Sequence, residues 1–301
     1  MPSDKTFVFV AGLHHSGTSL LHRLLGAHPE ISAFSGTGVP EDEGQHLQSL
    51  IPPALAYGGP ARFGFDPRAR LDETSPLATP LGAEKLYGEW APHWDLEKRL
   101  LIEKSPPTLV RLRFFQALFP HSVFVVILRH PIALAVATRR GFVRYTLRNS
   151  FSVGRRGGKS GPAASAPLHL RDLAKLRLRR DVEHTLICYE QAFRDLGHID
   201  RAFVLRYEDF VADPNAMLRR VFRFLGVAPV EAAEAVRRDV NARYVHAWRR
   251  GLLAPLRARI AARFEERARA VGYSLVEPAR QVPLSVSGSD VTVAEGPAAG
   301  S

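Results

Sequence analysis

The fold is decided by residues 6–27, TFVFVAGLHHSGTSLLHRLLGA. An apolar run at 6–11 has the composition of a buried strand, and the leucines that follow the loop recur at the spacing of a helix face. Between them lies the loop GLHHSGTS, residues 12–19. The backbone N–H groups of such a loop, together with the positive end of the following helix, form a cradle for an anion. The stretch therefore predicts a phosphate-binding loop between a strand and a helix.

This loop differs from a nucleoside-triphosphate loop at one position. Its spacing matches G-x-x-x-x-G-K-[ST], but Thr18 stands where the lysine of that motif reaches the terminal phosphates. A nucleotide with less charge at its 5′ end therefore suits the cradle better than a triphosphate. A P-loop kinase or nucleoside triphosphatase, and a turn that merely caps a helix, are the alternatives. The candidate phosphate-binding residues are His14, His15, Ser16, Gly17, Thr18 and Ser19.

Beyond the loop, short apolar runs alternate with longer amphipathic ones, which is typical of βαβ units. Pro131 fits the first turn of a helix, and Gly226 fits a helix C-cap. The sequence thus predicts an α/β fold, a P-loop-like central parallel β-sheet flanked by helices on both faces in a single domain. Further strands are expected at 100–103, 122–128 and 202–207, and helices at 108–119, from 131 onward and at 213–226.

We expect this domain to span residues 1–277. The segment 149–167 is crowded with Gly, Ser, Pro and Arg, which is typical of a mobile surface loop. The segment 278–301 holds few large apolar residues besides valine, so we expect it to be a disordered C-terminal tail.

Composition excludes several classes of protein. The chain has 301 residues, 46% apolar and 24% charged, which matches a globular protein and excludes wholesale disorder and coiled coil. The net charge of +11 comes from 35 Arg against 6 Lys. Arginine forks suit an acidic ligand, whereas nucleic acid is disfavoured because no basic run is interleaved with aromatic residues. The single cysteine, Cys188, rules out a disulfide framework. With no targeting segment and no apolar run long enough to span a membrane, we expect a cytoplasmic protein.

Four blocks of the chain, between about Thr6 and Trp248, together resemble sulfotransferases that use 3′-phosphoadenosine 5′-phosphosulfate (PAPS) as co-substrate. The first block is Ser16-Gly17-Thr18-Ser19, which is similar to the [KR]-S-G-T-[TS] loop that binds the 5′-phosphosulfate in that family. His15 replaces the basic residue before the serine. The positive charge that compensates the 5′-phosphate is then expected to depend on pH or to come from another residue.

The second block, Arg129-His130-Pro131, resembles the R-[DHN]-P of that family, whose arginine ends a strand and binds the 3′-phosphate together with a serine eight residues on. Here Ala137 stands at the serine position, and Thr138 is the neighbouring hydroxyl, about 100° further round an ideal helix. The resemblance implies that Arg129 binds the 3′-phosphate. Thr138 is the candidate for the role of the serine, and the alternative is a weakened hydroxyl contact with Arg139 and Arg140 supplying the missing contacts.

The third block, Glu103-Lys104-Ser105-Pro106, resembles the N-K-D-P run of the tyrosylprotein and related Golgi-type branch. The fourth, around Arg206-Tyr207-Glu208, resembles a Y-E-D-L segment whose tyrosine lies against the adenosine, and the stretch from Asn241 to Trp248 has a counterpart near the 3′ side of the cofactor. The resemblance implies Lys104 as the cation that stabilises the leaving phosphate and Tyr207 as an adenosine contact. Lys104 also follows an expected strand, where α/β sheets place ligand sites.

Transfer to a hydroxyl also needs a general base, which the family places just after the first helix. Here that stretch is GTGVPEDEGQH, residues 36–46. Alignment with a G-E-E-T block favours Glu43, and Glu41 and His46 compete with it because the glycines leave the register open. An acidic helix start that stabilises a helix dipole is the alternative interpretation of these acids.

The acceptor is not identified by the sequence. A glycan or a lipid-linked glycan is the favoured class, by analogy with the Golgi-type branch, and a small phenolic or lipid hydroxyl is the alternative. We expect no metal site, because the adjacent His14 and His15 point in different directions and no further ligand is evident. A nucleotide kinase and a non-catalytic nucleotide-binding protein are the alternative functions.

Overall fold

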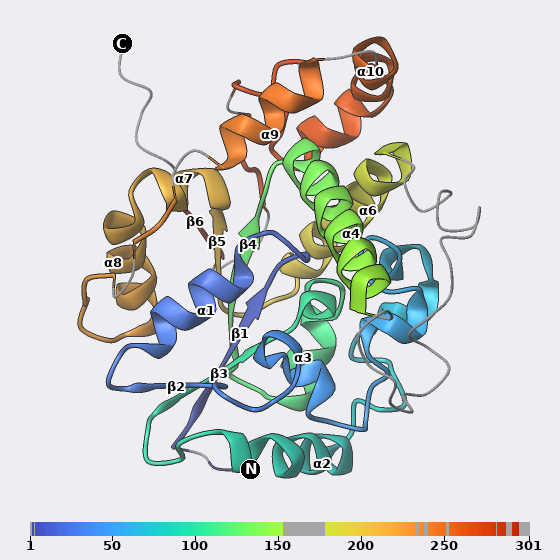
Figure 1. Cartoon of the computed structure of the whole chain (residues 1–301). Helices are drawn as coiled ribbons and strands as arrows, with labels where there is room; N and C mark the ends of the chain where they lie inside the picture. The colour runs from blue at the N-terminus through green and yellow to red at the C-terminus, as the bar shows by residue number, and fades with distance from the viewer. Residues whose placement is uncertain are drawn as a thin grey trace.

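A parallel sheet forms the centre of the molecule (Figure 1). The computed structural model describes residues 2, 4–152, 178–232, 235–237, 240–250, 253–280, 282–286 and 291–294. Within these residues the sheet has six strands in the order β2-β3-β1-β4-β5-β6, and every neighbouring pair is parallel. The strands are β1 Thr6–Ala11, β2 Ile31–Ala33, β3 Leu100–Lys104, β4 Val123–Leu128, β5 Ala202–Arg206 and β6 Val291–Val293.

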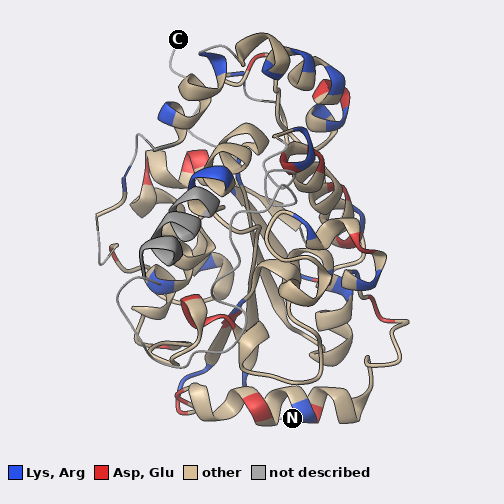
Figure 2. Ribbon diagram, turned by 45° about the vertical axis from the view of Figure 1, so that its right-hand side comes forward, with Lys and Arg blue, Asp and Glu red and all other residues tan. Residues whose placement is uncertain are grey.

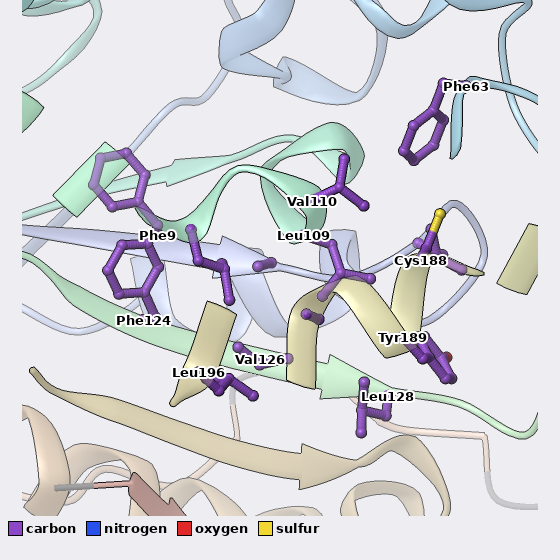
Figure 3. Close-up of a cluster of buried hydrophobic side chains, with 14 of the residues drawn as sticks. Phe9, Phe63, Leu109, Val110, Phe124, Val126, Leu128, Cys188, Tyr189 and Leu196 are labelled. Atoms are coloured by element: carbon purple, nitrogen blue, oxygen red, sulfur yellow. The ribbon is translucent and has the colours of Figure 1, made fainter. Parts of the chain in front are cut away.

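The central strand β1 is apolar on both faces because helices cover both faces of the sheet. Phe7 and Phe9 point into one hydrophobic cluster, and Val8 and Val10 point into the other. This alternation follows from the two-residue period of a strand. Figure 3 shows part of the first cluster, where Phe9 and Phe124 from neighbouring strands lie together, with ring centres 5.4 Å apart.

Helices are divided between the two faces by the clusters into which their apolar side chains point. Helices α1 and α8 contribute to the cluster of Val8 and Val10, whereas α2, α3, α4, α6 and α10 contribute to the cluster of Phe7 and Phe9. The α-helices are α1 Thr18–Gly26, α2 Pro80–Trp90, α3 Leu112–Leu118, α4 Pro131–Ser152, α6 Leu178–Leu196, α7 Tyr207–Ala212, α8 Pro214–Leu225, α9 Val240–Arg249 and α10 Ala254–Ala270.

The expected fold class and the four expected strands are confirmed. The start and end of α8 also follow the sequence, because the Asp213 side chain accepts a hydrogen bond from the Ala216 N–H at 2.9 Å and Gly226 adopts the left-handed conformation at the C-cap. The helix expected at 108–119 is a 3₁₀ turn, Pro106–Val110, followed by the shorter α3.

Two edge strands were not expected, and both are only three residues long. Strand β6 lies within 278–301, so the expectation of a disordered tail is wrong for Val291–Val293, which pair with β5. Such short strands carry too little periodicity to be recognised, and their pairing with the sheet stabilises them. The loop expected at 149–167 begins as the end of α4, up to Ser152, and 153–177 lie outside the described residues.

Basic residues are distributed over the molecule with acidic residues among them (Figure 2). Several arginines are engaged in ion pairs, as Arg267 is with Glu190 at 2.6 Å and Arg269 with Glu265 at 2.7 Å. Among the described residues, no helix has the length and apolarity required to cross a membrane.

Candidate active site

The phosphate loop connects β1 to α1, and glycine is required at both ends of it. A Cβ at Gly12 would lie 2.7 Å from the carbonyl oxygen of Ile127. Gly17 has φ +99°, which side chains rarely adopt, and a Cβ there would lie 2.6 Å from the Tyr207 ring. Because these two residues have no side chain, the loop can lie close to β4 and to the start of α7.

Ser16 in this loop has a polar atom without a partner. Its side chain is fully buried, and its Oγ has no hydrogen-bond partner within the described structure. Buried hydroxyls are normally bonded, so an unpartnered one at the start of a helix fits a site that is completed by a ligand oxygen.

A cavity of about 420 Å³ opens in front of the loop. It brings together most of the residues that the sequence singled out, from four separate parts of the chain. The lining residues are His14, His15, Gly17, Thr18, Ser19, Leu20, Glu41, Glu43, Pro106, Arg129, Ala137, Arg140, Gly141, Tyr207 and Tyr244.

Arg129 follows β4 and is 5% exposed. Its Nε donates to Asn241 Oδ1 at 2.9 Å, and its Nη1 donates to the carbonyl oxygen of His15 at 2.6 Å. Nη2 is buried and has no partner among the described residues. The guanidinium group lies 4.1 Å from the centre of the Tyr207 ring. Two internal hydrogen bonds thus hold Arg129, and its Nη2 remains available to bind an anion.

The backbone of Arg129 is fixed by Tyr189, which the sequence did not indicate, and by Glu208 and Asn241, which it indicated only as parts of motifs. The Tyr189 hydroxyl on α6 donates to the carbonyl oxygen of Arg129 and accepts from its N–H, both at 2.8 Å. Glu208 accepts from the His130 N–H at 2.9 Å and from Asn241 Nδ2 at 2.8 Å. Burial raises the pKa of Glu208. These contacts orient the end of β4, and only the tertiary fold brings α6 and α9 to it.

Tyr244 lines the cavity one turn beyond Asn241 on α9; the sequence indicated the stretch from Asn241 to Trp248 but not this residue within it. The guanidinium of Arg140 lies 4.8 Å from the centre of its ring. An aromatic residue on an amphipathic helix gives no signal of this kind, since most such residues pack in a core.

Lys104 ends β3 and is completely buried. Its Nζ donates to the carbonyl oxygen of Glu41 at 2.8 Å and lies 3.3 Å from both Glu43 Oε1 and Ser19 Oγ. The contact with Ser19 places the ammonium group directly beside the phosphate loop. A buried lysine needs such oxygen partners to remain charged.

The three candidate bases occupy different places around this lysine. Glu43 is buried at 7% exposure and its carboxylate contacts Lys104. Glu41 offers Lys104 only its backbone carbonyl, and its own side chain is exposed. His46 lies with its Nε2 3.8 Å from Glu43 Oε2. Glu43 therefore combines contact with the lysine and access to the cavity.

Glu103, immediately before Lys104, is a buried carboxyl group with 1% exposure. Burial raises its pKa to about 7, and the hydroxyl of Ser105 donates a hydrogen bond to it. The sequence indicated Glu103 only as part of a motif. Its environment depends on Gly44, where a Cβ would lie 2.6 Å from Glu103 Oε1.

Both histidines of the loop have a lowered pKa. Burial lowers the pKa of His14 to about 3 and also lowers that of His15, to which the charge of Arg129 contributes. His15 lies in the left-handed region with φ 68°, which turns its carbonyl oxygen to Arg129. Within the described part of the chain, no group of three or more His, Cys, Asp or Glu side chains is arranged to hold a metal ion.

Thr138 lies apart from the other expected cofactor ligands. Ala137 lines the main cavity, whereas Thr138 lines a separate small void together with Asp181 and His184. The 100° between successive helix residues accounts for the difference, because α4 turns position 137 towards the phosphate loop. The expected substitution of the family serine by Thr138 has no support in this geometry.

The fold and the site together define a nucleotide-binding α/β protein with a cation and a carboxylate beside its phosphate loop. The model of the sulfotransferase family matches residues 8–231. The chain therefore belongs to the sulfotransferase family, as the motifs indicated.

Individual relatives are distant. The nodulation protein NoeE of Sinorhizobium fredii is 26% identical over 236 residues, which cover 73% of this chain and 50% of that protein. This chain thus spans about half the length of that relative. Among solved structures, the sulfotransferase domain from the curacin biosynthetic pathway is 18% identical and covers 86% of this chain and 97% of that chain, with a TM-score of 0.46. A sulfotransferase from Alicyclobacillus acidocaldarius is 17% identical and covers 87% and 96%, with a TM-score of 0.45.

Proposed function

We propose that this protein transfers the sulfuryl group of PAPS to an acceptor hydroxyl. One observation carries the proposal: Lys104 Nζ lies 3.3 Å from Ser19 Oγ of the phosphate loop, while Glu43 and Arg129 line the same cavity. A cation beside the loop, a carboxylate beside the cation and an arginine across the cavity are the groups that this reaction requires.

The donor fits the polar groups that the chain leaves without partners. The Ser16 hydroxyl and the backbone of the loop would hold the 5′-phosphosulfate, and the free Nη2 of Arg129 would hold the 3′-phosphate. Tyr207 packs against both Gly17 and Arg129, which suits a contact with the adenosine. When bound, PAPS supplies an activated sulfuryl group and a bisphosphate leaving group.

The reaction is an in-line displacement, for which the chain supplies a cation and a base. Lys104 stabilises the negative charge that develops on the leaving phosphate. Glu43 accepts the proton of the acceptor hydroxyl, because it lines the cavity and its carboxylate lies beside Lys104. Glu41 and His46 are the competing candidates for this role. The buried position of Lys104 excludes water from the charge that it stabilises.

The acceptor belongs, in this proposal, to the glycan or lipid-linked glycan class. Arg140 is exposed and lines the cavity, which suits an acceptor that carries negative charge. The single cysteine is consistent with action in the reducing environment of the cytoplasm.

Calorimetric titration with 3′,5′-adenosine bisphosphate, in parallel with ATP and Mg²⁺, tests the proposal without knowledge of the acceptor. We expect the bisphosphate to bind and ATP to bind much more weakly, because Thr18 stands where a triphosphate loop has its lysine. Preferential binding of ATP would contradict the proposal and favour a nucleotide kinase. A screen of glycan and phenolic acceptors with ³⁵S-labelled PAPS then identifies the substrate class.

A further inference from the structure

We propose that Gln45 is a positioning residue that holds the Glu43 carboxylate in a fixed orientation and aims it at the acceptor. This inference rests on the proposed function in one respect, because it takes Glu43 as the group that accepts the proton. Gln45 lies in the short 3₁₀ turn Gly44–His46 and is 6% exposed. It does not line the cavity that holds the phosphate loop.

The orientation of the Gln45 side-chain amide is dictated by its neighbours. The Ala54 N–H donates to Gln45 Oε1 at 2.8 Å, and a backbone N–H can only donate, so the oxygen of the amide must face Ala54. The amide nitrogen is thereby turned to the other side, where Nε2 donates to Glu43 Oε2 at 2.5 Å. A glutamine satisfies both contacts at once, and neither a carboxylate nor an apolar side chain can do so.

The two oxygens of Glu43 are consequently divided between two donors. Oε1 faces Lys104 Nζ at 3.3 Å, and Oε2 receives the Gln45 amide. Two donors on different oxygens fix the rotation of the carboxylate group, so that its remaining lone pairs keep one direction. The other titratable groups near Glu43 are Glu103 on β3 and His46 in its own turn, with His46 Nε2 3.8 Å from Oε2.

Gln45 is itself anchored to the strand that carries the lysine. Its backbone N–H donates to Ser105 Oγ at 2.8 Å, and the Ser105 hydroxyl donates in turn to Glu103. Ser105 directly follows Lys104 in the chain. Contacts therefore connect Lys104 to Glu43, Glu43 to Gln45, and Gln45 to the residue that follows Lys104. These contacts fix the distance between the Glu43 carboxylate and the Lys104 ammonium group, although the two residues lie in segments that are far apart in the sequence.

Two variants of Gln45 and one matched control test this role. Gln45→Met keeps the volume and removes the donor, whereas Gln45→Glu keeps the shape and the acceptor for Ala54 but places a carboxyl group against Glu43. Gln48→Met is the control. Gln48 Nε2 donates to the carbonyl oxygens of Ile51 at 2.6 Å and of Gln45 at 3.2 Å, and Gln48 Oε1 accepts from the Ile51 N–H at 2.7 Å. The control therefore removes bonds to the backbone of the same segment and leaves the side-chain bond between Gln45 and Glu43 in place.

The first readout is turnover, followed as the release of 3′,5′-adenosine bisphosphate from PAPS. We expect turnover to fall about 10- to 150-fold in Gln45→Met, since a hydrogen bond to a charged group contributes about 1.5–3 kcal/mol. We expect a larger fall in Gln45→Glu and no fall in Gln48→Met. Affinity for 3′,5′-adenosine bisphosphate, measured by calorimetry, is expected to stay unchanged in all three variants.

A double-mutant cycle of Gln45→Met with Glu43→Gln provides the second readout. Because Gln45 acts through Glu43, we expect its loss to change turnover little once the Glu43 carboxylate is gone. Unchanged turnover in both Gln45 variants, an equal fall in Gln48→Met, or additive losses in the cycle would overturn the proposal. A wild-type protein that releases no bisphosphate from PAPS would refute the proposed function, whereas full turnover in the Gln45 variants refutes only the role of Gln45.

Discussion

The replacement of Arg129 by alanine tests the donor site directly. The structure shows which nitrogens of the arginine are available to a ligand. Nε is used by Asn241 and Nη1 by the carbonyl oxygen of His15, whereas Nη2 is buried without a partner. Arg129 therefore has one nitrogen, Nη2, that is free for the 3′-phosphate.

The expected magnitude follows from that count. One hydrogen bond between charged groups contributes about 1.5–3 kcal/mol, which corresponds to a loss of about 10- to 150-fold in affinity for 3′,5′-adenosine bisphosphate. Arg129→Lys keeps the charge but cannot serve Asn241 and His15 in the same planar geometry, so we expect an intermediate affinity.

Calorimetry with two ligands separates this contact from a general loss of structure. Wild type and Arg129→Ala are each titrated with 3′,5′-adenosine bisphosphate and with adenosine 5′-monophosphate, which lacks the 3′-phosphate. We expect the substitution to weaken the first ligand and to leave the second almost unaffected, so that the double-mutant cycle shows coupling. Equal losses for both ligands, in a variant that still unfolds cooperatively, would refute the assignment of Arg129 to the 3′-phosphate.

Three further predictions concern the groups around the phosphate loop. In Lys104→Ala we expect turnover to fall about 10²- to 10³-fold and bisphosphate affinity to fall much less, because the lysine acts on charge that develops in the transition state. Single-turnover kinetics measures the loss of rate, and calorimetry measures the loss of affinity. Equal losses of rate and affinity would mean that Lys104 only binds the ligand. Glu43→Gln is expected to abolish most turnover, whereas Glu41→Gln and His46→Ala keep it; normal turnover in Glu43→Gln would give the role to one of the others. Because burial raises the pKa of Glu103 to about 7, folding takes up a proton between about pH 4.5 and 7, and this carboxyl group makes the protein less stable as pH rises through that window. Denaturant unfolding at several pH values should show a smaller loss of stability with rising pH in Glu103→Gln, by up to about 3 kcal/mol, and identical pH profiles would contradict the role of burial.

Much of the fold could be predicted because it depends on patterns that are local in the sequence. The apolar runs of β1, β3, β4 and β5 predict a sheet buried on both faces, and glycines and prolines mark the ends of several helices. The short edge strands β2 and β6 could not be predicted, because three residues carry no measurable periodicity and their stability comes from pairing with the sheet.

The candidate site divides in the same way. Motif spacing indicated the phosphate loop, Lys104 and Arg129, since each follows a strand and the carboxyl ends of parallel strands meet at one edge of a sheet. Spacing could not choose among Glu41, Glu43 and His46, because two glycines with positive φ precede them and the path of the chain there is set by contacts with β3. Spacing also could not show that Ala137 lines the main cavity while Thr138 lines a separate void, because the direction of each residue depends on how α4 packs.

The sequence by itself determined the order of strand, loop and helix, the identity of the anion-binding loop and the family, because these depend on residue types at short, fixed spacings. Only the tertiary structure decided which acid reaches Lys104, that Gln45 bonds this acid, and that Tyr189 and Asn241 hold Arg129. Those contacts join segments about 60 to 110 residues apart, with the exception of Gln45 and Glu43. Their geometry arises from the packing of helices on the sheet, which no local pattern in the chain encodes.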